Sequence, residues 1–177
     1  MVNKFQLSEE LSKHIDDDTG IVLIGSTLVW WDKTSPMIGS ILRDKYKIPN
    51  VYGTYEDPIT ALNLEERISN IKHNKIIAID SGVRVGNTCI GEILFGDIPI
   101  KPGLGIGKNL MSIGDVSIVA VTVDQKRALC DYKQYGSTKE ENIISGLICD
   151  ISWAINDAYV KSIKRYWQIN CDMLYLY

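Results

Sequence analysis

The sequence predicts an α/β protein: a three-layer α/β/α sandwich with a mostly parallel central sheet. Three runs, 21–24, 76–79 and 116–123, are apolar almost throughout. A strand with water on one face needs alternating polar positions, so these runs are typical of parallel strands covered by helices on both faces. Segments with helical spacing of apolar residues separate the runs and follow the last one. This alternation is the pattern of a layered α/β fold.

Size and composition are those of a single globular domain. The chain has 177 residues, 45% of them hydrophobic and 23% charged, which is enough to bury a core without disulfides or a structural metal. We therefore expect one domain over residues 1–177. The net charge of −3 argues against nucleic acid as a partner, because phosphate binding needs a basic stripe.

Cysteine spacing and hydropathy exclude further classes. The cysteines at 89, 130, 149 and 171 form no Cys-x-x-Cys pair, so we predict no metal site and no cofactor. Residues 1–18 are charged and lack the apolar core of a signal peptide. No stretch approaches the roughly 20 apolar residues that span a bilayer. We expect a cytoplasmic protein with free thiols and no membrane partner.

Each element of the first half has a local signal. Leu7, Leu11 and Ile15 have the four-residue spacing of an amphipathic helix. Pro36 suits the first turn of a helix. Asp57 is a suitable N-cap with Pro58 in the turn that follows. The elements expected in order are a helix at 5–17, a strand at 21–24, a turn at 25–27, a helix at 37–45, a strand at 50–54 and a helix from 58 to about 72.

Two adjacent tryptophans interrupt the first strand-to-helix connection. Trp30 and Trp31 place bulky apolar surface where such a loop is usually polar. They could form a lid, an oligomer contact or a plug that fills a pocket. A plug or a contact is the commoner outcome because exposed aromatic rings seek burial. The sequence is therefore compatible with either a monomer or a homo-oligomer.

The second half continues the alternation. Apolar residues at 89–94 and 98–100, with Gly96 and Asp97 between them, predict a β-hairpin-like insertion. The segment 124–136 is polar and is expected to be a loop. Thr138, with Glu141 three residues later, predicts a capping box at the start of a C-terminal helix over 138–165.

Asp80 is the first candidate for chemistry. It closes the apolar run at 76–79, and Ser81 and Gly82 follow at once. Open α/β sheets bind their ligands at the carboxyl ends of parallel strands. The alternative is that Asp80 only caps the next turn by accepting backbone hydrogen bonds.

A glycine-rich loop follows at 102–108. It is not a Walker A loop, because Pro102 and Asn109 stand where that motif requires glycine and Ser or Thr. It is not a dinucleotide fingerprint either, because its GxGxG does not open a helix. Lys108 alone keeps open a third class of function, nucleotide or phosphate binding.

Several short sequence motifs along the chain, taken together, resemble those of a known family. They are Val51-Tyr52-Gly53-Thr54, Pro58 with Ala61-Leu62-Asn63-Leu64-Glu65-Glu66, Ile77-Ala78-Ile79-Asp80, Ile100-Lys101-Pro102-Gly103 with Gly105 and Gly107-Lys108, and Gly114-Asp115-Val116-Ser117-Ile118. In this order they resemble the YyaC-type sporulation proteins, which are classed as spore proteases of endospore-forming bacteria. The resemblance spans 21–123. It implies a phosphorylase/hydrolase-like fold similar to that of germination protease and hydrogenase maturation proteases.

The resemblance also implies catalytic residues. Germination proteases are attributed two aspartates, one before the first helix and one ending the central strand, and the second falls on Asp80. Pro36 stands at the other acidic position, and Asp32 matches only an earlier aspartate of the family. Hydrolysis by paired acids needs one carboxyl protonated and the other ionised. Asp32 completes the pair only if its loop folds back. Hydrogenase maturation proteases instead use two carboxylates and a histidine around nickel, but His14 and His73 are expected on helix surfaces far from this motif.

The first hypothesis is a sporulation-associated, metal-free acid-type endopeptidase acting through Asp80 and Asp32 on a peptide or protein substrate such as a spore protein. The resemblance implies the cytoplasm of the forespore or mother cell. The rival is a non-catalytic relative that binds a peptide or protein partner in the same cleft, with Pro36 replacing the first acid and the tryptophans filling its space. The residues expected to hold substrate are Ser81, Gly82, Gly103, Gly105 and Lys108.

Overall fold

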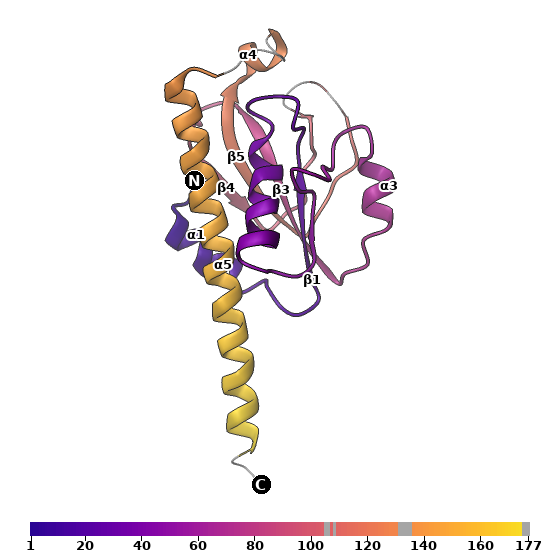
Figure 1. Ribbon diagram of the computed structural model, residues 1–177, viewed down its shortest axis with the longest axis vertical. Coiled ribbons are helices and arrows are strands. Elements are labelled where there is room, and N and C mark those ends of the chain that lie inside the picture. The colour runs from indigo at the N-terminus through magenta and orange to yellow at the C-terminus, as the bar shows by residue number, and fades with distance from the viewer. Residues whose placement is uncertain (105–106, 108, 131–135, 175–177) are drawn as a thin grey trace.

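The computed structural model describes residues 1–104, 107, 109–130 and 136–174. The elements in chain order are α1 (Lys4–Leu11), β1 (Thr19–Ile24), α2 (Thr34–Ser40), the π-helical turn η1 (Ile41–Lys45), β2 (Val51–Tyr52), α3 (Leu64–Ser69), β3 (Lys75–Arg84), β4 (Ile93–Gly96), β5 (Val116–Asp124), α4 (Gln125–Cys130) and α5 (Thr138–Leu174). Figure 1 shows their arrangement, with α1 and α5 on one side of the sheet and α3 on the other.

The sheet has five strands in the order β2-β1-β3-β5-β4. β1 pairs in parallel with β2 and β3, and β3 pairs in parallel with β5. Only β4, at the edge, is antiparallel to its neighbour β5. The predicted α/β class with a mostly parallel sheet is confirmed.

Strand side chains alternate between two apolar clusters, one on each face of the sheet. On β1, Ile21 and Leu23 pack with α1, α2 and α5, whereas Val22 and Ile24 face α3. The α3 layer is thin, because the segments around Ile59 and Ile113 supply much of its cover. Each fully buried Ile or Leu contributes about 1.5–3 kcal/mol, so the larger cluster dominates the stability of the sandwich.

Two predicted helices in the first half are shorter than expected. α1 ends at Leu11 and is capped by Asn3, whose side chain accepts hydrogen bonds from the backbone of Phe5 and Gln6. The helix predicted from Asp57 and Pro58 is wrong at its start, because α3 begins only at Leu64.

Tertiary contacts displace the start of α3. Ile59 is fully buried and forms a parallel bridge with Ile24, which holds this stretch extended. The Asp57 carboxylate instead accepts two hydrogen bonds from the Arg67 guanidinium, at 2.6 and 2.5 Å.

The second half differs from the prediction in three places. The stretch 98–100 is not a strand, and only Ile100 forms a bridge, with Ile113. The predicted loop 124–136 contains α4, and its residues 131–135 lie outside the described part. The helix cap lies one residue earlier than predicted: the Ser137 amide and hydroxyl donate to the Glu140 carboxylate at 2.7 and 2.6 Å.

α5 also corrects the hydropathy prediction. Within the described residues, one stretch of α5, Thr138–Tyr166, is long and apolar enough by length and composition to cross a membrane. Its apolar side chains include Ile144, Ile151 and Ile155, which are buried in the cluster beneath the helix. Of the most apolar part of this stretch, 44% is buried within the protein.

Candidate functional site

The connection after β1 folds back over the end of the strand. A Cβ added at Gly25 would lie 2.3 Å from the backbone oxygen of Asp32 and 3.0 Å from Cδ of Pro36. Only glycine leaves room for this approach. The Gly25 amide donates to the carbonyl of Ile59 at 2.9 Å, which holds the turn against the sheet.

Asp32 is held in place at both its side chain and its backbone. Its Oδ2 accepts a 2.7 Å hydrogen bond from the Ser26 amide, which stabilises negative charge on the carboxylate. Its backbone carbonyl accepts a hydrogen bond from the Ser81 hydroxyl at 3.3 Å. The loop that carries Asp32 is therefore attached to β3 directly beside Asp80.

Asp80 does not end its strand as predicted, because β3 continues to Arg84. It lies instead beside the last residue of β1, Ile24, and opposite Val119 of β5. Ala78 lies on the α3 face, so Asp80, two residues on, points to that face as well. The residue is half-buried.

The two carboxyl groups interact electrostatically. Burial raises the pKa of Asp80 well above its usual range, and the negative charge of Asp32 raises that pKa further. A backbone hydrogen bond at Ser81 acts in the opposite direction. The arrangement therefore favours a protonated Asp80 beside an ionised Asp32, the division that close carboxylates create.

Ser81 has a positioning role in this geometry. It is 6% exposed, and its hydroxyl lies 3.1 Å from the Ser35 hydroxyl and 3.3 Å from the Ser35 amide. Ser81 therefore links β3 to the first turn of α2. Gly82 is packed closely, because an added Cβ would lie 2.3 Å from Cγ1 of Val119.

Sequence reasoning missed the contributions of Gly25 and Ser35. Glycine directly after a buried strand is a weak signal of close backbone approach. Nothing in the sequence shows that Ser35 meets Ser81, because 46 residues separate the two.

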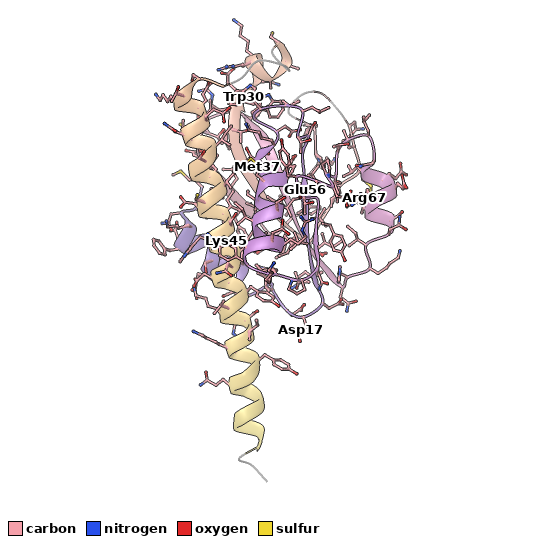
Figure 2. The ribbon with its side chains drawn as sticks, in the orientation of Figure 1. Asp17, Trp30, Met37, Lys45, Glu56 and Arg67 are labelled. Atoms are coloured by element: carbon pink, nitrogen blue, oxygen red, sulfur yellow. The ribbon has the colours of Figure 1, made fainter. Side chains whose placement is uncertain are left out.

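The two tryptophans are buried, as expected for either a plug or a contact. Trp30 and Trp31 are 6% and 4% exposed and belong to the main apolar cluster. Figure 2 shows Trp30 beside the start of α5. The Arg127 guanidinium lies 5.0 Å from the centre of the Trp30 ring, and Lys33 pairs with Glu141 at 3.4 Å. These contacts tie the Asp32 loop to α4 and α5.

Pro36 lies buried inside α2, at the third residue of the helix. Among the predicted substrate-binding residues of the glycine-rich loop, Gly103 is described and has a φ of +73°. Gly105 and Lys108 lie outside the described residues, so their predicted roles stay predictions.

The histidines differ from the prediction of exposed helical residues. Both lie in connections and are partly buried. His14 contacts Asp97 at 3.1 Å, and His73 contacts Asp18 at 3.0 Å and the Tyr52 hydroxyl at 2.8 Å. In the part of the chain that the structure describes, no three His, Cys, Asp or Glu side chains gather closely enough to hold a metal ion.

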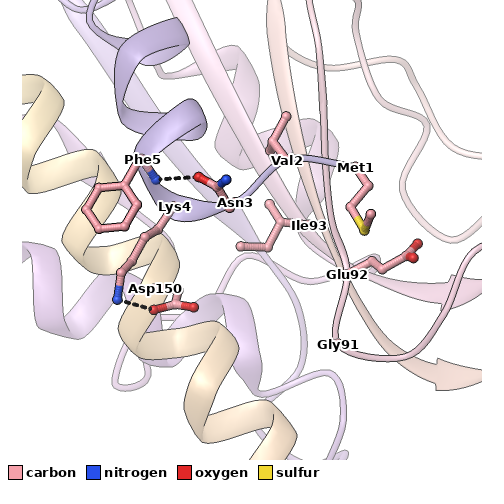
Figure 3. Close-up of a pocket in the computed structure, with 9 residues that line it drawn as sticks. All are labelled: Met1, Val2, Asn3, Lys4, Phe5, Gly91, Glu92, Ile93 and Asp150. Atoms are coloured by element: carbon pink, nitrogen blue, oxygen red, sulfur yellow. Dashed lines mark hydrogen bonds and ion pairs between the residues drawn. The ribbon is translucent and has the colours of Figure 1, made fainter.

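Two surface pockets lie outside the carboxylate pair. One, of about 420 Å³, is formed by residues 1–5, 91–93 and Asp150 at the edge of β4; Figure 3 shows it with the 3.0 Å ion pair between Lys4 and Asp150. The other, of about 570 Å³, lies between the 61–66 segment and the 109–111 segment. We call it the α3 pocket.

Comparison with known proteins identifies the family. The family described as "Protein of unknown function (DUF1256)" matches residues 2–145. The chain is a member of the DUF1256 family.

A relative of this DUF1256 protein is the "Uncharacterized protein YyaC" of Bacillus subtilis (strain 168), with 34% identity over 118 residues, or 63% of this chain. This identity confirms the resemblance to YyaC-type proteins. The match spans only 57% of the length of that relative.

Among solved structures, the DUF1256 chain is similar to the [NiFe] hydrogenase maturation protease HycI from Thermococcus kodakarensis KOD1. The TM-score is 0.55 at 14% identity, and the similarity covers 82% of this chain and 98% of that one. At this identity the similarity establishes the fold alone. It confirms the predicted hydrogenase-maturation-protease-like sandwich.

Proposed function

We propose that this DUF1256 protein hydrolyses peptide bonds by an acid-type mechanism through Asp32 and Asp80. One observation carries the proposal: the Ser81 hydroxyl donates to the Asp32 carbonyl and so holds Asp32 next to Asp80, which pairs in β3 with the last residue of β1. Burial and the charge of Asp32 raise the pKa of Asp80 there. The protease-like fold supports it.

The proposed chemistry divides between the two carboxyls. Ionised Asp32 takes a proton from a water molecule while the water oxygen attacks the peptide carbonyl carbon. Protonated Asp80 gives its proton to the carbonyl oxygen, so a neutral tetrahedral diol forms. Asp32 then returns its proton to the leaving amine nitrogen, the carbon–nitrogen bond breaks, and Asp80 recovers a proton from the diol.

The neighbouring residues position this pair. Gly25 lets the Asp32 loop approach the strand, and Ser81 holds the Asp32 carbonyl. Pre-organised geometry of this kind matters because a small misplacement of a reacting group costs a large factor in rate.

The test is digestion of a small acid-soluble spore protein, followed by mass spectrometry between pH 4 and 8. Asp80→Asn and Asp32→Asn should each abolish cleavage, whereas the exposed control Asp17→Asn should cleave like the wild type. The rate should fall at high pH as Asp80 ionises and at low pH as Asp32 is protonated. Cleavage by Asp80→Asn at the wild-type rate would refute the assigned role.

A second candidate is a non-catalytic relative that binds a peptide or protein partner. Pro36 is buried in α2 at the position where the resemblance to germination proteases implies an acid, and this favours the second candidate, as do the buried tryptophans at this end of the fold. Under this alternative, the wild type binds the spore protein without cleaving it at any pH in the tested range.

We also propose a role in sporulation, in the cytoplasm of the forespore or mother cell, from the relationship to YyaC-type proteins. The match spans little more than half of the Bacillus relative, so the proposal concerns the matched part of that protein. Immunodetection in fractionated sporulating cells tests the location.

A further inference from the structure

We infer that the α3 pocket is a substrate subsite that accepts an apolar side chain next to a lysine or arginine of a peptide. The inference rests on the proposed function, because it places a peptide across the carboxylate pair. Nothing in the chemistry of Asp32 and Asp80 requires such a pocket, so it concerns selectivity.

The pocket lies on the same face of the sheet as Asp80. One wall is the start of α3 and the residues before it, and the other is the 109–111 segment. Leu64 and Leu110 connect both walls to the apolar cluster that contains Ile24 and Ala78. Asp80 follows Ala78 by two positions and points to this side.

The separation from the carboxylates suits a peptide. Ile59 bridges Ile24 on the side of β1 away from β3, while Ile24 pairs with Asp80 on the other side. Two strand spacings, about 10 Å, therefore separate Ile59 from Asp80. The pocket wall begins at Ala61, two residues beyond Ile59. An extended peptide covers 10 Å in about three residues, so the pocket receives a side chain about three or more positions from the cleaved bond.

The lining indicates the chemistry of the occupant. Leu62 is 97% exposed and Met111 is 44% exposed, so both present apolar surface that a ligand can cover. The volume of about 570 Å³ is in the range of pockets that hold small ligands or large side chains.

The charge of the pocket wall favours a basic residue in the peptide beside the apolar side chain. Glu65 and Glu66 line the pocket, and no basic side chain does so among the described residues. A peptide with Lys or Arg beside the apolar side chain therefore matches this wall, whereas an acidic neighbour is repelled.

The experiment separates binding from cleavage by using the full chain with Asp80→Asn. The probe is a fluorescein-labelled ten-residue peptide of Gly and Ser with one central Leu-Lys step, measured by fluorescence anisotropy. Replacing Leu by Ser in the peptide should weaken binding about tenfold, since burial of a leucine side chain contributes an effect of this order. Replacing Lys by Glu should also weaken binding, because Glu65 and Glu66 repel an acidic side chain.

Variants of the protein test whether the peptide binds in the α3 pocket. Leu62→Ser combined with Met111→Ser should weaken the Leu-Lys peptide about tenfold, and Glu65→Gln with Glu66→Gln should remove the preference for Lys over Glu. The matched control is Leu129→Ser, an exposed leucine on α4 (50% exposed), which should bind like the parent. Circular dichroism verifies that each variant is folded.

Three outcomes would overturn the subsite: equal binding by pocket and control variants, absence of peptide binding, or a self-associated dimer that dissociates on Leu62→Ser. Cleavage by the wild type without preference for the Leu-Lys step would refute the subsite and leave the proposed function intact. Selective binding without cleavage by the wild type would refute the peptidase and keep the pocket.

Discussion

Replacing Asp80 by asparagine tests the electrostatics of the site independently of any substrate. The variant keeps the shape of the side chain and removes its titration. In the folded protein, burial and the charge of Asp32 hold the pKa of Asp80 well above the ordinary value of 3.8. In the unfolded chain, water and the lost neighbour restore an ordinary pKa.

The sign of the effect follows from this difference. Below pH 3.8 Asp80 is protonated in both states, so its titration costs no stability. Above that pH the unfolded chain gains free energy by ionising, while the folded protein retains the proton. Wild-type stability should therefore fall as pH rises, until the pH reaches the folded pKa of Asp80.

The size of the stability difference follows from the single proton that Asp80 binds. The free energy of unfolding of Asp80→Asn minus that of the wild type should rise with pH by up to about 1.4 kcal/mol per pH unit, then level off where folded Asp80 ionises. Asp32→Asn should bring the levelling to lower pH, because it removes the second cause of the raised pKa.

Urea unfolding at half-unit steps from pH 4.5 to 8, followed by circular dichroism, measures the difference. The control is Asp17→Asn, whose exposed side chain lies at the lower edge of the sandwich, whereas Trp30 lies near its upper edge (Figure 2). A difference between Asp80→Asn and the wild type that does not change with pH would refute the inferred protonation of Asp80.

Three further predictions concern packing and surface charge. Trp31→Ala should lower the free energy of unfolding by about 3–5 kcal/mol in urea titrations, because it empties a buried site. Gly25→Ala should abolish spore-protein cleavage while the chain stays folded by circular dichroism, because the added Cβ displaces Asp32. Asp57→Asn should cost at most about 1 kcal/mol by urea unfolding, because the pair with Arg67 is largely exposed.

The candidate site was only half predictable. Asp80 followed from its place after an apolar run, a local signal. The approach of Asp32 did not, because it depends on the fit between Gly25 and the returning loop and on the hydrogen bond from Ser81. The Ser81 hydrogen bond joins positions 49 residues apart, and no local pattern encodes it.

Local signals also failed where long-range pairing competed with them. Asp57 and Pro58 have the residue types of a helix start, yet the bridge between Ile59 and Ile24 keeps that stretch extended. The cap of α5 was misplaced by one residue, because Ser137 and Thr138 are both suitable cap residues and only the contact with Glu140 distinguishes them.

The sequence by itself determined the three central strands β1, β3 and β5, the α/β class and the family resemblance, and it singled out Asp80, although β3 continues past that residue. Apolar periodicity and residue order are local properties of the chain. Only the tertiary structure decided that Asp32 lies beside Asp80, that the tryptophans are buried and that a pocket opens beside α3. Those features depend on how distant segments pack, and packing is determined by the whole fold.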